Sequence, residues 1–341
     1  MPKLYKILFL TSTFMGTLIS ISSHTWLGMW MGLEINLLSI IPLLSTKKNI
    51  LSNESAMKYF IVQAIASTMV MISIIMASLK INMQSNINFE ISTFMIMNSA
   101  LLTKMGMAPF HFWFPEVMEG QLWSNCLLIL TWQKIAPMII LMYNLYSIYI
   151  LSTFIILALV ISGVMGINQI SLRKILAYSS INHMGWMISS MMFFKTIWII
   201  YFTVYSVISI NIILILKKFK ILFLNQLFQS MNSHPMMKVL FIINFLSLSG
   251  IPPFLGFMPK WLTIQTMLEE NSMFMPTTMI ILTLITVYMY TRITLSSLIM
   301  NSNENSWNNF NKESSSQIMI ASFNFISLSS LIGITLMFNF S

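Results

Sequence analysis

Long apolar stretches alternate with short polar connections along nearly the whole chain. Each stretch has about 17 to 25 residues, and roughly 20 helical residues cross a hydrocarbon core of about 30 Å. The stretches lack the alternation by twos that the strands of a membrane β-barrel require. The pattern therefore predicts an all-α membrane protein with eleven transmembrane helices. The predicted spans are 5–23, 25–45, 57–79, 92–110, 122–146, 150–168, 174–192, 196–217, 237–258, 275–299 and 317–339.

The connections between these stretches are too short to fold alone. The longest are 218–236 and 300–316, whereas an independent domain has at least about 50 residues. We therefore expect residues 1–341 to form a single transmembrane domain, with every functional group in or beside the bilayer. Because Met1 leads directly into an apolar run without a small-residue cleavage site, we also expect the first span to be retained.

Composition supports this interpretation, and the distribution of basic residues predicts how the chain is oriented in the membrane. Apolar residues make up 57% of the chain and charged residues 8%, and the mean hydropathy is +0.80. The net charge of +9 would suggest nucleic acid in a soluble protein, but here the basic residues gather in loops on one side of the predicted membrane. That side holds Lys3, Lys6, Lys47, Lys48, Lys58, Arg173, Lys174, Lys217, Lys218, Lys220, Lys238, Arg292 and Lys312, and the other side holds Lys80 and Lys195.

Cytoplasm-like compartments receive the basic loops of membrane proteins. The distribution thus predicts that the N-terminus faces inside and the C-terminus outside, with no nucleic acid as a partner. Aspartate is absent from the chain, a bias typical of AT-rich organellar genomes.

The single cysteine, Cys126, limits the redox chemistry. One thiol cannot supply a disulfide framework, a four-thiolate iron–sulfur site or a cysteine-type zinc site. The chain also lacks a phosphate-binding loop, a dinucleotide-binding fingerprint, a catalytic triad and a metal-ligand cluster. We therefore expect no cofactor in this chain, and any electrons must travel on another one.

Three charges lie near the middle of predicted spans, where charge is expensive. Glu34 is close to the middle of the second span, and we place Lys104 and Lys134 near the middle of the fourth and fifth. Each midplane charge costs about 2.5 to 3.5 kcal/mol, so three at similar depth need compensation or water. We expect a row of titratable groups in the membrane plane that passes protons. The alternative is a salt bridge that holds helices together.

Prolines follow both lysines. Pro109 is expected to free the carbonyl of Met105, and Pro137 that of Gln133, because proline cannot donate to the carbonyl four residues earlier. Unpartnered carbonyls at membrane depth are tolerated where they line a wet cavity. The alternative for either proline is an ordinary helix kink.

A short internal repeat connects the two halves of the chain. Gly106-Met-Ala-Pro-Phe110 in the fourth span and Gly250-Ile-Pro-Pro-Phe254 in the ninth share the pattern G-x-x-P-F. Interrupted segments in corresponding halves are typical of inverted-repeat transporters with broken helices. We therefore predict two inverted five-helix repeats, 1–146 and 150–299, followed by a terminal helix, 317–339. Lys260 follows the second break, where a re-formed half-helix is expected to hold it within the membrane.

The remaining polar candidates are weaker. His183 lies about mid-span among Ser and Asn neighbours, and a relay role and a merely satisfied polar contact are both open. Glu116 and Glu119 are expected at the interface. We assign no chemical role to His24, His111 and His234.

Several motifs together resemble one family, the NADH-ubiquinone oxidoreductase chain 2 family of antiporter-like membrane subunits in mitochondrial complex I, in its insect-like form. The resemblance runs over nearly the whole chain and is carried by residues 33–36 (LEIN), 104–113 (KMGMAPFHFW), 132–137 (WQKIAP), 172–185 (LRKILAYSSINHMG) and 248–261 (LSGIPPFLGFMPKW).

The resemblance implies two inverted five-helix units plus a terminal helix, in a form shorter than bacterial relatives. It makes Glu34 and Lys104 an interacting pair, Lys134 the central lysine, and Lys260 the lysine of the second broken helix. His183 matches a family sequence pattern. The implied location is the mitochondrial inner membrane, with the N-terminus in the matrix and the C-terminus in the intermembrane space.

The family also implies partners and cofactors elsewhere. The expected partners are the other membrane-arm subunits of complex I, accessory subunits and inner-membrane lipids. NAD, FMN, iron–sulfur clusters and ubiquinone are expected on other subunits. The predicted function is proton translocation in a respiratory NADH:ubiquinone oxidoreductase.

Two other functions compete with this hypothesis. A free-standing cation/proton antiporter needs an ion site, and a chain with no Asp and one deep Glu supplies a carboxylate-rich site poorly. A purely architectural subunit would use its charges only to fix helix packing and to dock neighbours, and its Lys104 variant would keep the normal proton stoichiometry.

Overall fold

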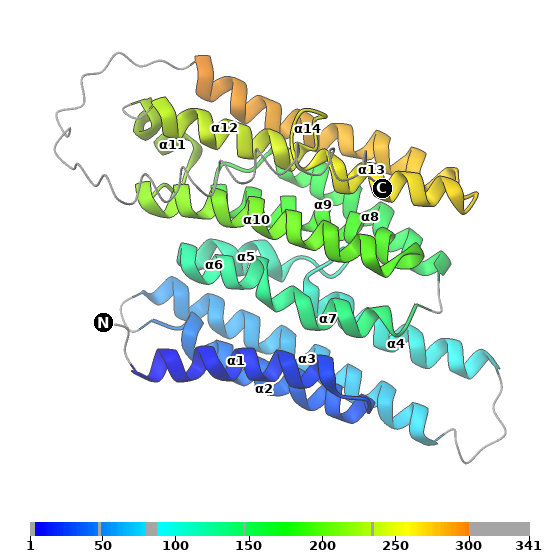
Figure 1. Cartoon of the computed structure of the whole chain (residues 1–341). Helices are drawn as coiled ribbons and strands as arrows, with labels where there is room; N and C mark the ends of the chain where they lie inside the picture. The colour runs from blue at the N-terminus through cyan, green and yellow to red at the C-terminus, as the bar shows by residue number, and fades with distance from the viewer. Residues whose placement is uncertain (1–3, 47–48, 80–86, 146–147, 233–234, 300–341) are drawn as a thin grey trace, which may run out of the picture. The chain divides into compact units, whose positions relative to one another are not determined.

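The computed structural model describes residues 4–46, 49–79, 87–145, 148–232 and 235–299. Within these ranges the chain is helical (Figure 1), and the single β-bridge, Ser171 with Phe223, belongs to no strand. The predicted all-α class is therefore confirmed for the described residues. The predicted terminal helix, 317–339, lies outside them.

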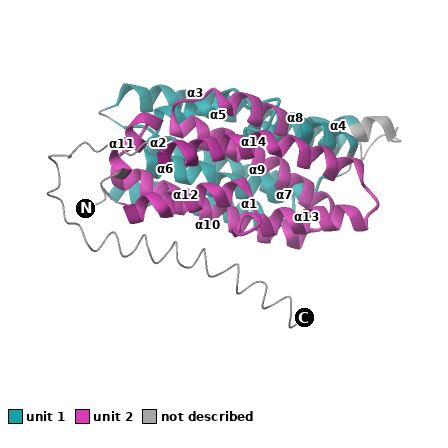
Figure 2. Ribbon diagram, turned by 90° about the horizontal axis from the view of Figure 1, so that it is seen from above, with its two compact units in different colours: residues 1–158 teal, residues 159–341 magenta. Residues whose placement is uncertain are grey.

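The chain divides into two compact units, residues 1–158 and 159–341 (Figure 2). The boundary falls inside helix α8, Ile148–Ile167. The predicted repeats instead meet in the short connection before that helix. Each unit has its own helices and its own buried polar groups, and each is described separately below.

In its described residues, unit 1 begins with four long helices and continues with three shorter ones. Helix α2 packs against α1 and α3, helix α3 also packs against α4 and α5, and α7 contacts α1, α2 and α4. The bounds are α1 Leu4–Ser22, α2 Trp26–Leu44, α3 Ile50–Leu79, α4 Ile87–Met105, α5 Trp113–Gly120, α6 Trp123–Leu130 and α7 Trp132–Met142.

Close packing in unit 1 depends on small residues. A Cβ added to Gly32 of α2 would lie 2.5 Å from the Ser20 nitrogen of α1, so the two backbones pass in direct contact there. Such approach through small residues is the usual packing of membrane helices, because lipid provides no hydrophobic drive between them.

Unit 2 contains the second half of α8 and six further helices. Helix α9 packs against α10 and α13, and α14 contacts α11, α12 and α13. The bounds are α9 Leu172–Phe193, α10 Lys195–Phe219, α11 Leu224–Asn232, α12 Pro235–Ser249, α13 Phe257–Glu269 and α14 Phe274–Ile299.

Membrane character follows from length and surface. Seven helical stretches in the described residues are long and apolar enough to cross a membrane. Large apolar side chains such as Leu8, Ile65 and Leu284 are more than half exposed, whereas water-soluble monomers rarely expose large continuous apolar patches.

Three predicted spans are interrupted. The stretch 92–110 ends its helix at Met105, the stretch 122–146 breaks at Thr131, and the stretch 237–258 ends its helix at Ser249. Hydropathy alone continues through these points, because the residues in the breaks are themselves largely apolar. Helix α13 is the half-helix that was expected after the second break, whereas α5 and α11 occupy segments read as connections.

Candidate functional site

The break after α4 places Lys104. Gly106 has a φ of 74°, its N–H donates to the Thr103 carbonyl, and the Met107 N–H donates to the Leu102 carbonyl. These two bonds close the helix end around a glycine in the left-handed region. Lys104 therefore lies in the last turn of α4, 7% exposed, at a helix end inside the predicted span 92–110. The negative end of a helix dipole favours a cation there.

The carbonyls at this break are partnered by side chains. Gln63 of α3 donates its amide to the Lys104 carbonyl at 2.9 Å, and the Trp113 indole donates to the Thr103 carbonyl at 3.2 Å. The prediction that Pro109 frees the Met105 carbonyl inside a continuing helix was wrong about the helix. It ends at Met105, four residues before the proline.

Lys134 lies beside a second discontinuity. Helix α6 ends before Thr131 and α7 starts at Trp132, so Lys134 is in the first turn of α7. It also lies near the middle of the apolar stretch Trp123–Met142, which is long enough to cross a membrane, as predicted. Its side chain is 1% exposed, and Nζ lies 5.6 Å from the centre of the Phe114 ring. Pro137 lies inside α7 without ending it.

Glu34 lies on α2 of unit 1 and forms no direct ion pair within the described residues. Its Oε2 is buried and has no hydrogen-bond partner within the described residues. The described residues also hold no ion pair between Glu34 and Lys104, although the two charges interact through space. The salt-bridge alternative therefore lacks a direct contact between these two residues.

An amide pair joins the helices that carry these charges, and sequence reasoning missed it. Asn36 of α2 donates to Gln133 Oε1 at 2.9 Å, and Gln133 of α7 donates back to Asn36 Oδ1 at 3.0 Å. Asn36 is two residues from Glu34, and Gln133 precedes Lys134. Amides so close to buried charges were a usable signal, but sequence alone did not pair them.

Unit 2 places Lys260 across its own helix break. Gly250 has a φ of 79° directly after α12, and Lys260 lies in the first turn of α13. Its Nζ donates to the carbonyl of Ser249, the last residue of α12, at 2.8 Å. The Trp186 ring centre lies 5.8 Å from the same nitrogen. The cation thus joins the two half-helices at a buried position, 7% exposed.

His183 lies in a buried polar cluster of unit 2. Its Nδ1 is 3.0 Å from the Tyr201 hydroxyl, and its ring centre is 5.1 Å from that of Tyr205. Next to it, Asn182 donates to the Thr286 hydroxyl at 2.7 Å. The tyrosines on α10 were missed because aromatic residues four apart in an apolar helix read as core packing.

The other candidate residues lie at the surface or have no assigned chemical role. Glu116 accepts from Lys58 at 3.0 Å, and Lys58 also pairs with Glu54. All three side chains are at least 44% exposed, which agrees with the interfacial position expected for Glu116. No group of three potential metal ligands occurs in the described ranges, and Cys126 is buried.

The structure therefore gathers the predicted residues into two sets. Unit 1 holds Glu34, Lys104 and Lys134 on the contacting helices α2, α4 and α7. Unit 2 holds His183 and Lys260 on the contacting helices α9 and α13. Four of these five residues are buried, and Glu34 is half-buried. Titratable groups buried at helix ends are suited to binding and releasing protons.

Known proteins are similar to this chain over most of its length. Residues 23–286 match the family described as NADH:quinone oxidoreductase/Mrp antiporter, transmembrane. NADH-ubiquinone oxidoreductase chain 2 of Anopheles gambiae is 47% identical over 99% of both chains. The Locusta migratoria chain of that name is 48% identical over 89% of this chain and 88% of its own.

Solved structures share the fold at lower identity. A chain of respiratory complex I from Thermus thermophilus superposes with a TM-score of 0.84 at 20% identity, covering 96% of this chain and 78% of that one. A chain of the Mrp complex from Dietzia gives a TM-score of 0.72 at 14% identity, covering 84% of this chain and 59% of that one.

Proposed function

The chain belongs to the NADH-ubiquinone oxidoreductase chain 2 family, and from this premise we propose that it carries protons through the membrane with Glu34, Lys104, Lys134, Lys260 and His183 as the titrating groups. It is a membrane subunit of a proton-translocating NADH:ubiquinone oxidoreductase. The role of the five residues is the new element, and it rests on their geometry.

The observation that carries the proposal is the burial of three lysines at helix breaks. Lys104, Lys134 and Lys260 are each no more than 7% exposed, and each lies within a turn of a helix end. A merely structural lysine in a membrane helix pairs with an acid or extends to the surface. Lys104 and Lys260 form no carboxylate ion pair within the described residues.

In this proposal, Glu34 is the residue of unit 1 that responds first to a change of charge in a neighbouring subunit. Gain or loss of a proton on Glu34 changes the field at Lys104, because the two charges interact without a direct bond. In a low-dielectric interior such a change is felt over several ångströms. We propose that Lys104 and then Lys134 respond to it, and that His183 and Lys260 perform the same exchange in unit 2.

The proposed arrangement in the membrane has eleven spans. We propose two inverted five-helix repeats, 1–146 and 150–299, with 317–339 as a terminal helix. The one-sided distribution of basic loops supports an N-terminus in the mitochondrial matrix and a C-terminus in the intermembrane space. The G-x-x-P-F segments, each with a positive-φ glycine, support the repeat.

The subunit requires partners for its source of free energy. We propose that NAD, FMN, iron–sulfur clusters and ubiquinone bind to other subunits. Neighbouring membrane-arm and accessory subunits and inner-membrane lipids would surround this chain. Protonation changes in an adjacent subunit would act on Glu34 or Lys260 electrostatically.

The test is proton stoichiometry in the assembled complex. Glu34→Gln and Lys104→Ala are each expected to lower the number of protons pumped per NADH oxidised, because each removes one member of the coupled pair. The measurement follows NADH absorbance and vesicle pH together.

Lys58→Ala is the matched control, because it removes an exposed lysine from the same unit. It should leave the ratio unchanged. An unchanged ratio in both relay variants, with normal assembly, would instead favour the architectural function.

A further inference from the structure

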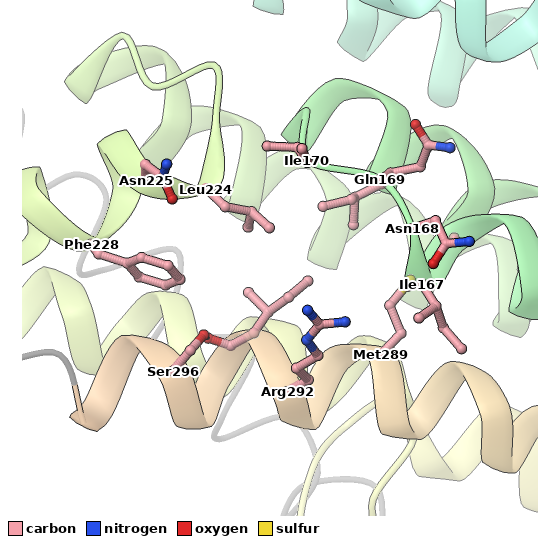
Figure 3. A pocket seen from close by; sticks show the side chains of 13 residues that line it. Ile167, Asn168, Gln169, Ile170, Leu224, Asn225, Phe228, Met289, Arg292 and Ser296 are labelled. Carbon is pink, nitrogen blue, oxygen red and sulfur yellow. The ribbon is translucent and has the colours of Figure 1, made fainter.

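Unit 2 contains a cavity that the proton-carrying residues do not use. It has a volume of about 510 Å³ and lies between the end of α8, the connection to α9, helix α11 and helix α14 (Figure 3). Small-molecule and cofactor sites in proteins are typically about 300 to 1,000 Å³. The cavity is therefore large enough for a ligand group, and every residue that lines it belongs to unit 2.

The lining separates into an apolar wall and a polar edge. Phe228 of α11 and Met289 and Ile293 of α14 supply apolar surface. Arg292 projects from α14 into the same space, opposite Asn225 and beside Asn168 (Figure 3). A ligand that fits both parts has an apolar body and a polar, hydrogen-bond-accepting head.

Arg292 is exposed and available to bind an anion. It forms no hydrogen bond or ion pair within the described residues. The acidic residues in the described part of unit 2 are Glu269 and Glu270 at the end of α13. They precede α14, whereas Arg292 lies about 27 Å further along that helix at 1.5 Å per residue. The planar guanidinium matches phosphate oxygens with two parallel donors.

The surrounding charge also favours an anion. The Leu172 N–H donates to the Leu222 carbonyl at 3.0 Å, and the Leu224 N–H donates to the Ile170 carbonyl at 3.2 Å. These bonds hold the cavity rim against the start of α9 and the end of α10. Those two helix ends carry Arg173, Lys174, Lys217, Lys218 and Lys220. A basic cluster of this kind at the inner side of a membrane attracts anionic lipid heads.

The depth of Arg292 fits a lipid phosphate. Helix α14 has 26 residues, about 39 Å at 1.5 Å per residue, which exceeds a hydrocarbon core of about 30 Å. Arg292 lies about 10 Å from the end of this helix. With the excess length shared between the two ends, the Arg292 backbone lies about 6 Å inside the hydrocarbon boundary. A long arginine side chain spans that distance to the headgroups, so the head and tail of one lipid reach the two parts of the lining.

We propose that this cavity binds an anionic phospholipid. The phosphate accepts from Arg292, the amides of Asn168 and Asn225 donate to its remaining oxygens, and an acyl chain lies along Phe228, Met289 and Ile293. The site shares no residue with the proton relay, so either proposal can fail without the other.

The first experiment uses the unmodified assembled complex in nanodiscs. Phosphatidylglycerol with a photoreactive diazirine in one acyl chain is compared with phosphatidylcholine that carries the same group. Adducts are expected mainly from phosphatidylglycerol and on residues 224–228 and 289–296. Unlabelled phosphatidylglycerol should compete, and glycerol phosphate, which has no acyl chain, should not.

Equal adduct yields from the two lipids at these residues would overturn the proposal. So would competition by glycerol phosphate, which would make this a site for free phosphate, or crosslinks from the cavity to a protein segment in place of lipid. The comparison needs no variant, so a folding defect cannot leave it undecided.

A matched pair of variants then identifies the headgroup contact. Arg292→Gln is expected to lower the phosphatidylglycerol adduct about fivefold, the ratio that corresponds to about 1 kcal/mol per basic residue at a membrane surface. Lys238→Gln removes a basic residue of unit 2 that does not line the cavity and should leave the adduct unchanged. An unchanged yield in Arg292→Gln, or an equal loss in both variants, would remove Arg292 from the site.

Discussion

Lysines at helix ends are the main feature at the scale of single residues. Their location within apolar runs was predictable, since a charge within an apolar run is visible in any sequence. Their local settings were not. The sequence placed Lys104 and Lys134 near span centres, whereas one ends a helix and the other begins one. The difference arises because apolar residues fill the breaks, so hydropathy does not register them.

Lys260 allows a test that separates charge from tethering. Lys260→Met removes both the cation and its 2.8 Å bond to the Ser249 carbonyl, and we expect proton pumping per NADH to fall. Lys260→Arg keeps a cation and several donors, so we expect the variant to retain the helix contact and part of the pumping. The measurement is proton stoichiometry together with the thermal stability of the complex. Normal pumping by Lys260→Met would reduce Lys260 to a tie between α12 and α13.

Tyr201 tests whether the polar cluster around His183 is functional. Tyr201→Phe keeps the ring but removes the hydroxyl that lies 3.0 Å from His183 Nδ1. We expect a loss of stability of about 1 kcal/mol, the typical net value of one hydrogen bond, and slower coupled turnover. The exposed Tyr288 on α14 provides the matched control, Tyr288→Phe, which should alter neither. Identical turnover in the two variants would leave His183 a satisfied polar contact.

At the scale of elements, broken helices distinguish this chain from a simple bundle. Gly106 and Gly250 each follow the last residue of a helix with φ near 75°, a conformation that costs other L-residues about 1 to 2 kcal/mol. The G-x-x-P-F pattern predicted both interruptions. It did not predict how they differ, because the position ten residues after the glycine is Glu116 in the first and Lys260 in the second. Glu116 pairs with Lys58 at the surface, and Lys260 is buried.

The amide pair between α2 and α7 is expected to stabilise the packing of these two helices. Gln133→Leu leaves the buried Asn36 amide without its partner, so we expect a loss of about 1 to 3 kcal/mol in stability. Asn36→Leu combined with Gln133→Leu removes both partners and should recover much of that loss. The measurement is a double-mutant cycle on the thermal stability of the assembled complex. Strictly additive effects would show that the pair does not join the two helices energetically.

At the scale of the whole molecule, the sequence predicted the helical class of the described residues, whereas the bounds of the repeats stay a prediction. An all-helical membrane protein follows from repeated apolar runs, and the described residues agree. Predicted repeats of 1–146 and 150–299 differ from compact units that divide within α8. In the sequence, the connection between two apolar helices looks like a boundary. The compact units depend instead on which neighbouring helices each half of α8 packs against. Gly163 and Gly166, for example, contact residues of α14, so the second half of α8 belongs to unit 2.

The largest-scale prediction concerns the source of free energy. A single cysteine cannot hold a four-thiolate iron–sulfur cluster, and the chain carries no Gly-rich phosphate cradle. We therefore propose that the driving event arrives from adjacent subunits, as a change of charge near Glu34 or Lys260. Moving one charge across 100 mV takes about 2.3 kcal/mol, an amount within reach of a nearby change of charge in a low-dielectric interior. We expect the isolated chain in sealed vesicles to conduct protons passively or to stay closed when NADH and quinone are supplied. Internal pH is followed with an entrapped dye, and the intact complex in identical vesicles is the positive control. Sustained acidification by the isolated chain, driven by these substrates, would mean that it has an energy source of its own and does not depend on its partners.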